Sequence, residues 1–102
     1  MKTAIEMIAA ERWRQIEGEG WTPKRDDNHT DEELAIAAAT YAMPEKKRLY
    51  RGLWRAGDGV MPHDWPFEWD WKPTPGDRIR ELVKAGALIV AEIDRLMRAG
   101  NS

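Results

Sequence analysis

The chain has 102 residues, of which 42% are hydrophobic and 33% charged, so it can form one packed core with a polar surface. Its net charge of −2 gives no general attraction for nucleic-acid polymers or anionic membranes, and the lack of cysteine excludes disulfides and thiolate metal sites. Without a signal peptide or an apolar run of membrane-spanning length, we expect a single cytoplasmic domain covering residues 1–102.

A first helix is predicted over residues 3–17. Its apolar residues recur at spacings of three and four and form one stripe: Ile5, Ile8, Ala9, Trp13 and Ile16. Gly18 and Gly20 are expected to end this helix. Residues 18–29 then form a loop rich in turn-forming residues.

A second helix is predicted over residues 30–43. Thr30 followed by Glu33 fits a capping box, and the alanine-rich body is apolar on nearly every side, which is typical of a buried helix. Residues 45–73 form a long connection that contains four of the six tryptophans and lacks regular periodicity. A short basic helix at its start remains open, whereas Pro62 and Pro66 exclude a regular helix further on.

A third helix is predicted over residues 75–98, with Thr74 as its cap and Pro75 at its first position. Apolar residues follow at helical spacing for about six turns, and Gly100 closes the helix. The expected fold is therefore mostly α, with three helices and a Trp-rich irregular connection between the second and third. The long apolar stripe, with small residues at 85–87, favours a homodimer or a higher homo-oligomer.

Acidic residues allow an enzymatic alternative, a Mg²⁺-dependent nucleotide pyrophosphohydrolase. Such enzymes hold the metal with paired carboxylates one helical turn apart. Glu32, Glu33 and Asp27 would supply the ligands here, but Ile36 and Ala37 occupy the next turn. Ser102 is the only serine, so the usual nucleophilic triads are absent. We expect no metal, no cofactor and no catalytic residue, and the sequence favours a binding protein over an enzyme.

Asp26, Asp27 and His29 lie in the predicted loop before the second helix. Three interpretations remain open for them: carboxylates that only satisfy turn donors, contacts to ribose hydroxyls of a ligand, or a metal half-site. Lys84 lies in an otherwise apolar run, where it either reaches the surface or waits as a buried cation for an anion.

The tryptophans are the most informative residues. Five of them lie in or beside irregular segments: Trp21, Trp54, Trp65, Trp69 and Trp71. Cationic residues are interleaved with them, and aromatic faces stack on bases with about 1–3 kcal/mol per base while Arg and Lys hold phosphates. This combination favours a small nucleotide ligand over a polymer, although Trp54 and Trp65 are equally compatible with core packing.

Two resemblances extend this interpretation. The strings E-R-W-R-Q (11–15), E-G-W-T-P (19–23), D-D-x-H (26–29), W-K-P (71–73) and L-V-K-A-G-A-L (82–88) resemble short uncharacterised bacteriophage and prophage proteins. Arg14, residues 20–22, His29, Leu34 and Tyr41 are similar to the pattern of ryanodine-receptor repeat domains, without the prolines that flank the His and Tyr there. Prokaryotic versions of that domain accompany nucleotide-signalling defence systems, so the resemblance implies a nucleotide-derived ligand.

The leading hypothesis is a phage-encoded, non-enzymatic sponge for a cyclic nucleotide or an ADP-ribose derivative, acting in the host cytoplasm against defence signalling. Two alternatives remain. The first is the pyrophosphohydrolase, and the second is an inhibitor that binds a host protein through exposed tryptophans. The expected ligand contacts are Arg14, Trp21, Arg25, Asp26, Asp27, His29, Tyr41, Trp69, Trp71, Lys72 and Lys84.

Overall fold

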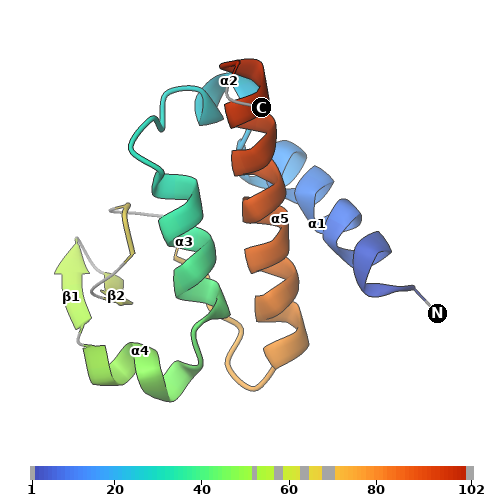
Figure 1. Cartoon of the computed structure of the whole chain (residues 1–102). Coiled ribbons are helices and arrows are strands. Elements are labelled where there is room, and N and C mark those ends of the chain that lie inside the picture. Colours follow the sequence, from blue (N-terminus) through green and yellow to red (C-terminus); the bar gives the residue numbers. More distant parts are fainter. Residues whose placement is uncertain (1, 52, 57–58, 63–64, 68–70, 101–102) are drawn as a thin grey trace.

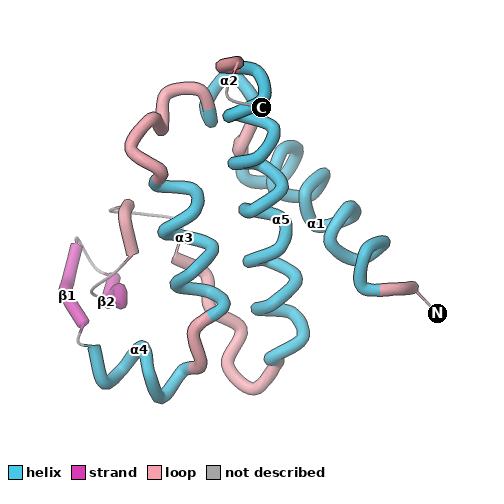
Figure 2. Tube along the Cα trace, in the orientation of Figure 1, coloured by secondary structure: helices cyan, strands magenta, loops and turns pink. Residues whose placement is uncertain are grey.

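The computed structural model describes residues 2–51, 53–56, 59–62, 65–67 and 71–100. The protein is mostly helical, as predicted (Figures 1 and 2). The elements in chain order are α1 (Ala4–Glu19), α2 (Pro23–Asp26), α3 (Glu33–Ala42), α4 (Glu45–Arg51), β1 (Leu53–Ala56), β2 (Gly59–Pro62) and α5 (Arg78–Arg98). The three predicted helices correspond to α1, α3 and α5.

Helix α5 runs through the middle of the molecule, with α3 on one side and α1 on the other (Figure 1). The short helix α2 packs against α5 near its C-terminal end. α4 and the two strands lie beyond α3, on the side away from α1 (Figure 2). Among the described helices, none combines the length and the apolar composition that crossing a bilayer requires.

Helix α1 has well-formed ends. The Thr3 hydroxyl accepts a hydrogen bond from the Glu6 backbone N–H at 3.2 Å, and the Glu6 carboxylate accepts one from the Thr3 N–H at 2.9 Å. This capping box lowers the pKa of Glu6, because the backbone of Thr3 donates to its charged form. At the other end Gly20 adopts φ 74°, a left-handed conformation that glycine takes without steric cost, so its role as the helix end is confirmed. Gly18 does not end the helix but lies inside it, because α1 continues to Glu19, two residues beyond the predicted end.

The other two predicted helix starts are wrong by three residues. α3 begins at Glu33 rather than at residue 30, and the residue before it has a left-handed backbone with no side-chain cap. Glu33 does not close a capping box with Thr30, because its carboxylate accepts from the Asp31 N–H at 2.6 Å instead. α5 begins at Arg78, where the Asp77 carboxylate accepts from the Arg80 N–H at 3.0 Å.

The connection between α3 and α5 is more regular than predicted. It contains α4, which is the short basic helix that the sequence left open, and an antiparallel hairpin. In the hairpin Leu53 lies opposite Pro62, and Ala56 lies opposite Gly59. Pro62 is tolerated because it ends an edge strand, where a missing N–H donor costs no ladder hydrogen bond.

The hydrophobic core lies between α3, α5 and the loops that cover them. Small residues of α3 allow close approach to α5, and aromatic rings fill the space at the ends: Leu34, Ala37, Ala38, Tyr41, Ala85, Leu88, Ala91, Trp21, Trp65 and Phe67. The rings of Trp21 and Trp65 both meet Phe67 edge-on, with centroids 5.2 and 5.6 Å apart. The predicted burial of the second helix is therefore confirmed for one side of α3, whereas Ile36 and Ala39 on its other side are exposed.

Candidate functional site

Four cationic side chains gather where α1, α5 and the segment before α5 meet. We call them the cation cluster: Arg14, Lys72, Arg80 and Lys84. They surround two carboxylates of α1, Glu11 and Glu19. Three of the four cations were predicted as phosphate contacts from the sequence.

Glu11 is the centre of this arrangement, with a side chain that is fully buried. It accepts hydrogen bonds from Nε and Nη2 of Arg14, both at 2.7 Å, and pairs with Arg80 Nη2 at 2.6 Å. Although burial alone raises the pKa of a carboxyl group, the two guanidinium groups hold the pKa of Glu11 below its ordinary value. Glu11 is therefore ionised, and it fixes both arginines in place.

Glu19 joins a second pair of cations. Its carboxylate lies 2.7 Å from Arg14 Nη2 and 2.7 Å from Lys72 Nζ. Burial again raises its pKa, but hydrogen bonds from Lys72 and Arg14 outweigh that effect and lower it. The side chain of Lys72 is 57% exposed, so its ammonium group can exchange Glu19 for another anion without moving the core.

The backbone of Lys72 is held from both sides. Its N–H donates to the Tyr41 hydroxyl at 3.0 Å, and its carbonyl accepts from Lys84 Nζ at 2.6 Å. Burial raises the pKa of Tyr41, which keeps the phenol neutral, and burial together with the charge of Arg80 lowers the pKa of Lys84. Lys84 is thus a buried cation whose ammonium bonds a carbonyl rather than reaching the surface.

Two hollows adjoin the cation cluster. The inner one has a volume of about 10 Å³, room for a single water molecule, and Gln15 Oε1 nearby has no hydrogen-bond partner among the described residues. The outer one, about 270 Å³, is open to solvent and is lined by Lys2, Met7, Ala10, Glu11, Arg14 and Arg80. Only the outer hollow has room for a ligand group larger than water.

The predicted stacking residues lie mostly in the core. Trp21 is 3% exposed, and the guanidinium of Arg25 lies 4.2 Å from the centre of its ring. Trp71 is half-buried and stacks on Tyr41, with centroids 4.8 Å apart. Trp69 lies outside the described residues. In this conformation neither Trp21 nor Trp71 presents an open face to a base.

The predicted acidic contacts point in different directions. Asp26 is fully buried and pairs with Arg12 at 2.8 Å, and burial raises its pKa. Asp27 is exposed and pairs with Arg98 at 2.8 Å, while His29 Nδ1 lies 3.3 Å from Glu33. Across the described part of the chain, no three side chains of His, Asp or Glu come together as metal ligands.

Sequence reasoning missed three residues of this site: Glu11, Glu19 and Arg80. A usable signal existed for two of them, because Glu11 stands three residues before Arg14 and Arg80 stands four before Lys84, spacings that share a helix face. Comparisons with family models, curated proteins and solved structures find no match to this chain.

Proposed function

We propose that the protein binds a small, phosphate-bearing nucleotide at the cation cluster and leaves it chemically intact. The observation that carries this proposal is the excess of positive charge there, four cations against two carboxylates, in a chain whose net charge is −2. Such a local excess creates a positive potential at the cluster, so it attracts anions there even though the chain as a whole is negatively charged.

Phosphate recognition would begin in the outer hollow. The ion pairs of Arg14 use Nε and Nη2, which leaves the two N–H donors of Nη1 for a ligand, since none of the described residues accepts from them. Arg80 lines the same hollow. Charge-assisted bonds from two arginines suit the oxygens of a phosphate, and a volume of about 270 Å³ holds that group with part of a nucleoside.

The aromatic residues would act indirectly in this scheme. Tyr41 and Lys84 fix the backbone of Lys72, so that its exposed ammonium group stays beside the cluster. Recognition then depends on phosphates more than on base stacking. In its most specific form, following the family resemblance, the ligand is a cyclic nucleotide or an ADP-ribose derivative that the protein sequesters.

The pyrophosphohydrolase alternative has less support from the geometry. It needs Glu32, Glu33 and Asp27 around one metal ion, yet Glu33 bonds His29 and the Asp31 N–H, and Asp27 pairs with Arg98. The distinction remains experimental: a binder returns its ligand unchanged, and an enzyme releases pyrophosphate in the presence of Mg²⁺.

Isothermal titration with ADP-ribose, a cyclic dinucleotide, ATP and inorganic pyrophosphate tests the proposal. We expect saturable binding of at least one of them and its recovery intact, by mass spectrometry, after denaturation. Lys72→Ala should weaken this binding about tenfold, because one charge-assisted bond is lost. Lys47→Ala, an exposed lysine of α4, is the matched control and should bind like wild type. Equal affinity of the two variants, or no binding of any probe, would refute the proposal.

A further inference from the structure

Helix α5 places most of its large apolar side chains away from the core. The face that packs toward the rest of the chain mixes mostly small apolar residues with buried charged ones: Val83, Ala85, Ala87, Leu88 and Ala91 with Glu81, Lys84, Glu92 and Arg95. The opposite face exposes large apolar side chains to solvent: Ile79, Leu82, Ile89, Val90, Ile93 and Met97. An isolated protein normally places such a stripe against its core.

Helix α1 also turns large apolar side chains to solvent. Its three buried residues are all polar or charged: Glu11, Arg12 and Gln15. Ile5 and Trp13, in contrast, are 81% and 63% exposed. Two neighbouring helices therefore turn their apolar sides to the same solvent. We call these exposed residues of α1 and α5 together the apolar face: Ile5, Trp13, Ile79, Leu82, Ile89, Val90, Ile93 and Met97.

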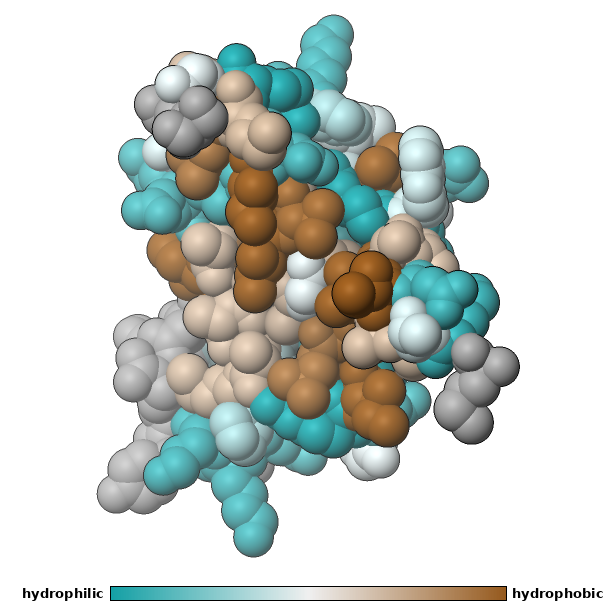
Figure 3. Space-filling model, turned by 45° about the vertical axis from the view of Figure 1, so that its right-hand side comes forward, coloured by the Kyte–Doolittle hydropathy of each residue, from teal (hydrophilic) through white to brown (hydrophobic). Residues whose placement is uncertain are grey.

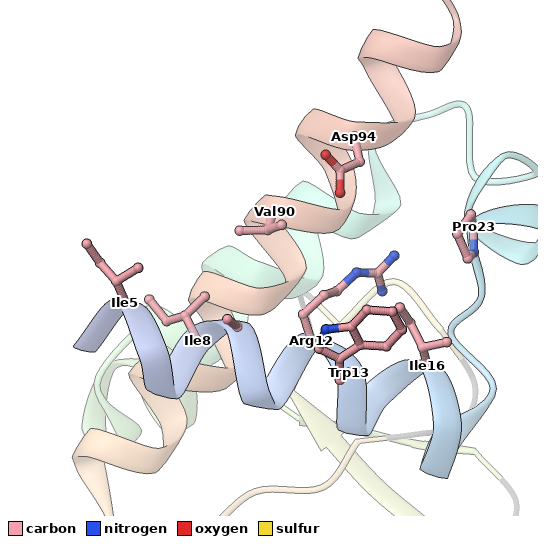
Figure 4. Close-up of a pocket in the computed structure, with 9 residues that line it drawn as sticks. Ile5, Ile8, Arg12, Trp13, Ile16, Pro23, Val90 and Asp94 are labelled. Carbon is pink, nitrogen blue, oxygen red and sulfur yellow. The ribbon is translucent and has the colours of Figure 1, made fainter. Parts of the chain in front are cut away.

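The apolar face is hollowed between the two helices. α1 and α5 cross where the side chain of Ile8 covers Gly86, and they diverge from there (Figure 4). The resulting groove has a volume of about 550 Å³, and its lining includes Trp13, Ile16 and Val90. Figure 3 shows brown, hydrophobic side chains gathered over this side of the molecule.

We propose that a second copy of the chain covers the apolar face and that the protein is a two-fold symmetric dimer packed through α1 and α5. The face has the size that such a contact needs. Its eight side chains, about half exposed on average, present on the order of 800 Å² per copy, which is one partner's share of a standard interface. Typical monomers expose smaller apolar patches, of roughly 300–600 Å².

The exposed residues of α5 are distributed on both sides of Gly86, which is compatible with a second copy as the partner. Ile79 and Ile93 lie seven positions before and after Gly86, and Leu82 and Val90 lie four positions before and after it. These four residues are therefore spaced evenly about Gly86, although Ile89 and Met97 have no exposed apolar counterparts before it. A two-fold interface requires only that both copies present the same patch to each other. Since Ile8 covers Gly86, the copies would meet as two pairs of helices rather than through α5 alone.

The charge of the groove is also compatible with self-association. Arg12 and Asp94 are its only charged lining residues in the described part of the chain. Arg12 is already neutralised by Asp26 at 2.8 Å. A face with so little charge meets its own copy without strong repulsion, whereas a partner of opposite charge would gain nothing there.

Sedimentation velocity and light scattering on the full chain test this proposal. Protein concentrations of about 10–100 µM suffice, because dimers with a micromolar Kd are populated there. Wild type should have the mass of two chains. Ile93→Glu should be monomeric while keeping its helical circular dichroism, because residue 93 is 50% exposed within one copy. Ile36→Glu, at a 42% exposed isoleucine of α3 outside the apolar face, is the matched control and should remain dimeric.

The second variant, Trp13→Glu, separates interface loss from misfolding, because it tests α1 instead of α5. If Ile93→Glu loses its helical circular dichroism, Trp13→Glu becomes the deciding variant. A Trp13→Glu protein that is folded but monomeric supports the proposal. The proposal is overturned if the wild type is still monomeric at about 100 µM, because the dimer's Kd would then lie above that concentration. It is also overturned if Ile36→Glu dissociates the dimer. A wild-type monomer that captures a different protein through this face would also overturn it. Nucleotide binding at the cation cluster is measured separately and is independent of this outcome.

Discussion

The ion pair between Arg12 and Asp26 offers the sharpest test of how the fold is held. It joins α1 to α2 at 2.8 Å, and the same guanidinium donates to the Trp21 carbonyl at 3.0 Å. Asp26 is completely buried, and its Oδ1 has no hydrogen-bond partner among the described residues. Arg12→Met would remove both bonds and leave an uncompensated carboxylate in the interior.

Removing one partner of a buried pair typically costs about 3–5 kcal/mol, because the remaining charge stays desolvated. Against a total free energy of unfolding of roughly 5–15 kcal/mol, that loss is large. We expect the thermal midpoint to fall by on the order of 20 °C in a domain of this size. The double variant Arg12→Met/Asp26→Asn should lose less than Arg12→Met alone, since neither charge is then left unpaired.

The pH dependence provides an independent check. Burial raises the pKa of Asp26 above its unfolded value even in wild type, and removing Arg12 raises it further. When a group has a higher pKa in the folded state than in the unfolded state, its protonation stabilises the fold. This contribution is complete at pH values below the unfolded-state pKa and is lost as the pH rises through the folded-state pKa. Relative to wild type, Arg12→Met should therefore recover stability on going from pH 7 to about pH 5, and the double variant should not.

Urea unfolding of wild type, both single variants and the double variant at the two pH values completes the cycle. Two results would contradict the reasoning. One is a loss of less than about 1 kcal/mol in Arg12→Met, the value typical of exposed pairs. The other is a double variant whose loss equals the sum of the two single losses, which would mean that the two residues are not coupled.

Three further predictions concern single positions. Gly18→Ala should raise the free energy of unfolding by about 0.5–1 kcal/mol, because alanine favours the helix and its Cβ would meet only one atom, at 4.0 Å. Gly20→Ala should lower it by about 1 kcal/mol, because φ 74° strains any residue with a Cβ. Thermal shifts in the same direction for both variants would contradict this. Arg48→Met should lower the free energy of unfolding, measured with urea, by about 3–5 kcal/mol, because it breaks a buried ion pair with Glu81. Arg98→Met should lower it by less than about 1 kcal/mol, because its pair with Asp27 is exposed. Similar losses in the two variants would refute the distinction. Tyr41→Phe should cost about 1–3 kcal/mol and should leave the phenolate absorbance at pH 11 unchanged, because burial raises the pKa of this phenol.

Much of the helical framework could be predicted because periodicity is a local signal. α1 and α5 each carry an apolar repeat of three and four residues, α3 has an alanine-rich apolar body, and Gly20 ends α1 as expected. The starts of α3 and α5 could not be predicted, because several residues near each start can cap a helix. Asp77 and the left-handed Glu32 occupy those positions, and tertiary contacts of the preceding turns decide between the candidates.

The direction of each apolar stripe was the harder problem. Periodicity locates a stripe on a helix, but it does not tell which neighbour covers it. The buried sides of α1 and α5 include ion-paired residues such as Glu11 and Arg95, whose partners are set by packing rather than by spacing alone. For the same reason Trp21 could not be assigned to the core in advance, since its surroundings come from Arg25, His29 and Phe67.

The central position of α5 has a consequence for the order in which the protein can fold during synthesis. α1, α2 and α3 all pack on α5, which follows them in the sequence. A nascent chain that has reached only residue 77 lacks the surface on which its earlier helices are organised. Its helices would then be too short to persist alone in water, so stable structure must wait until most of α5 has left the ribosome.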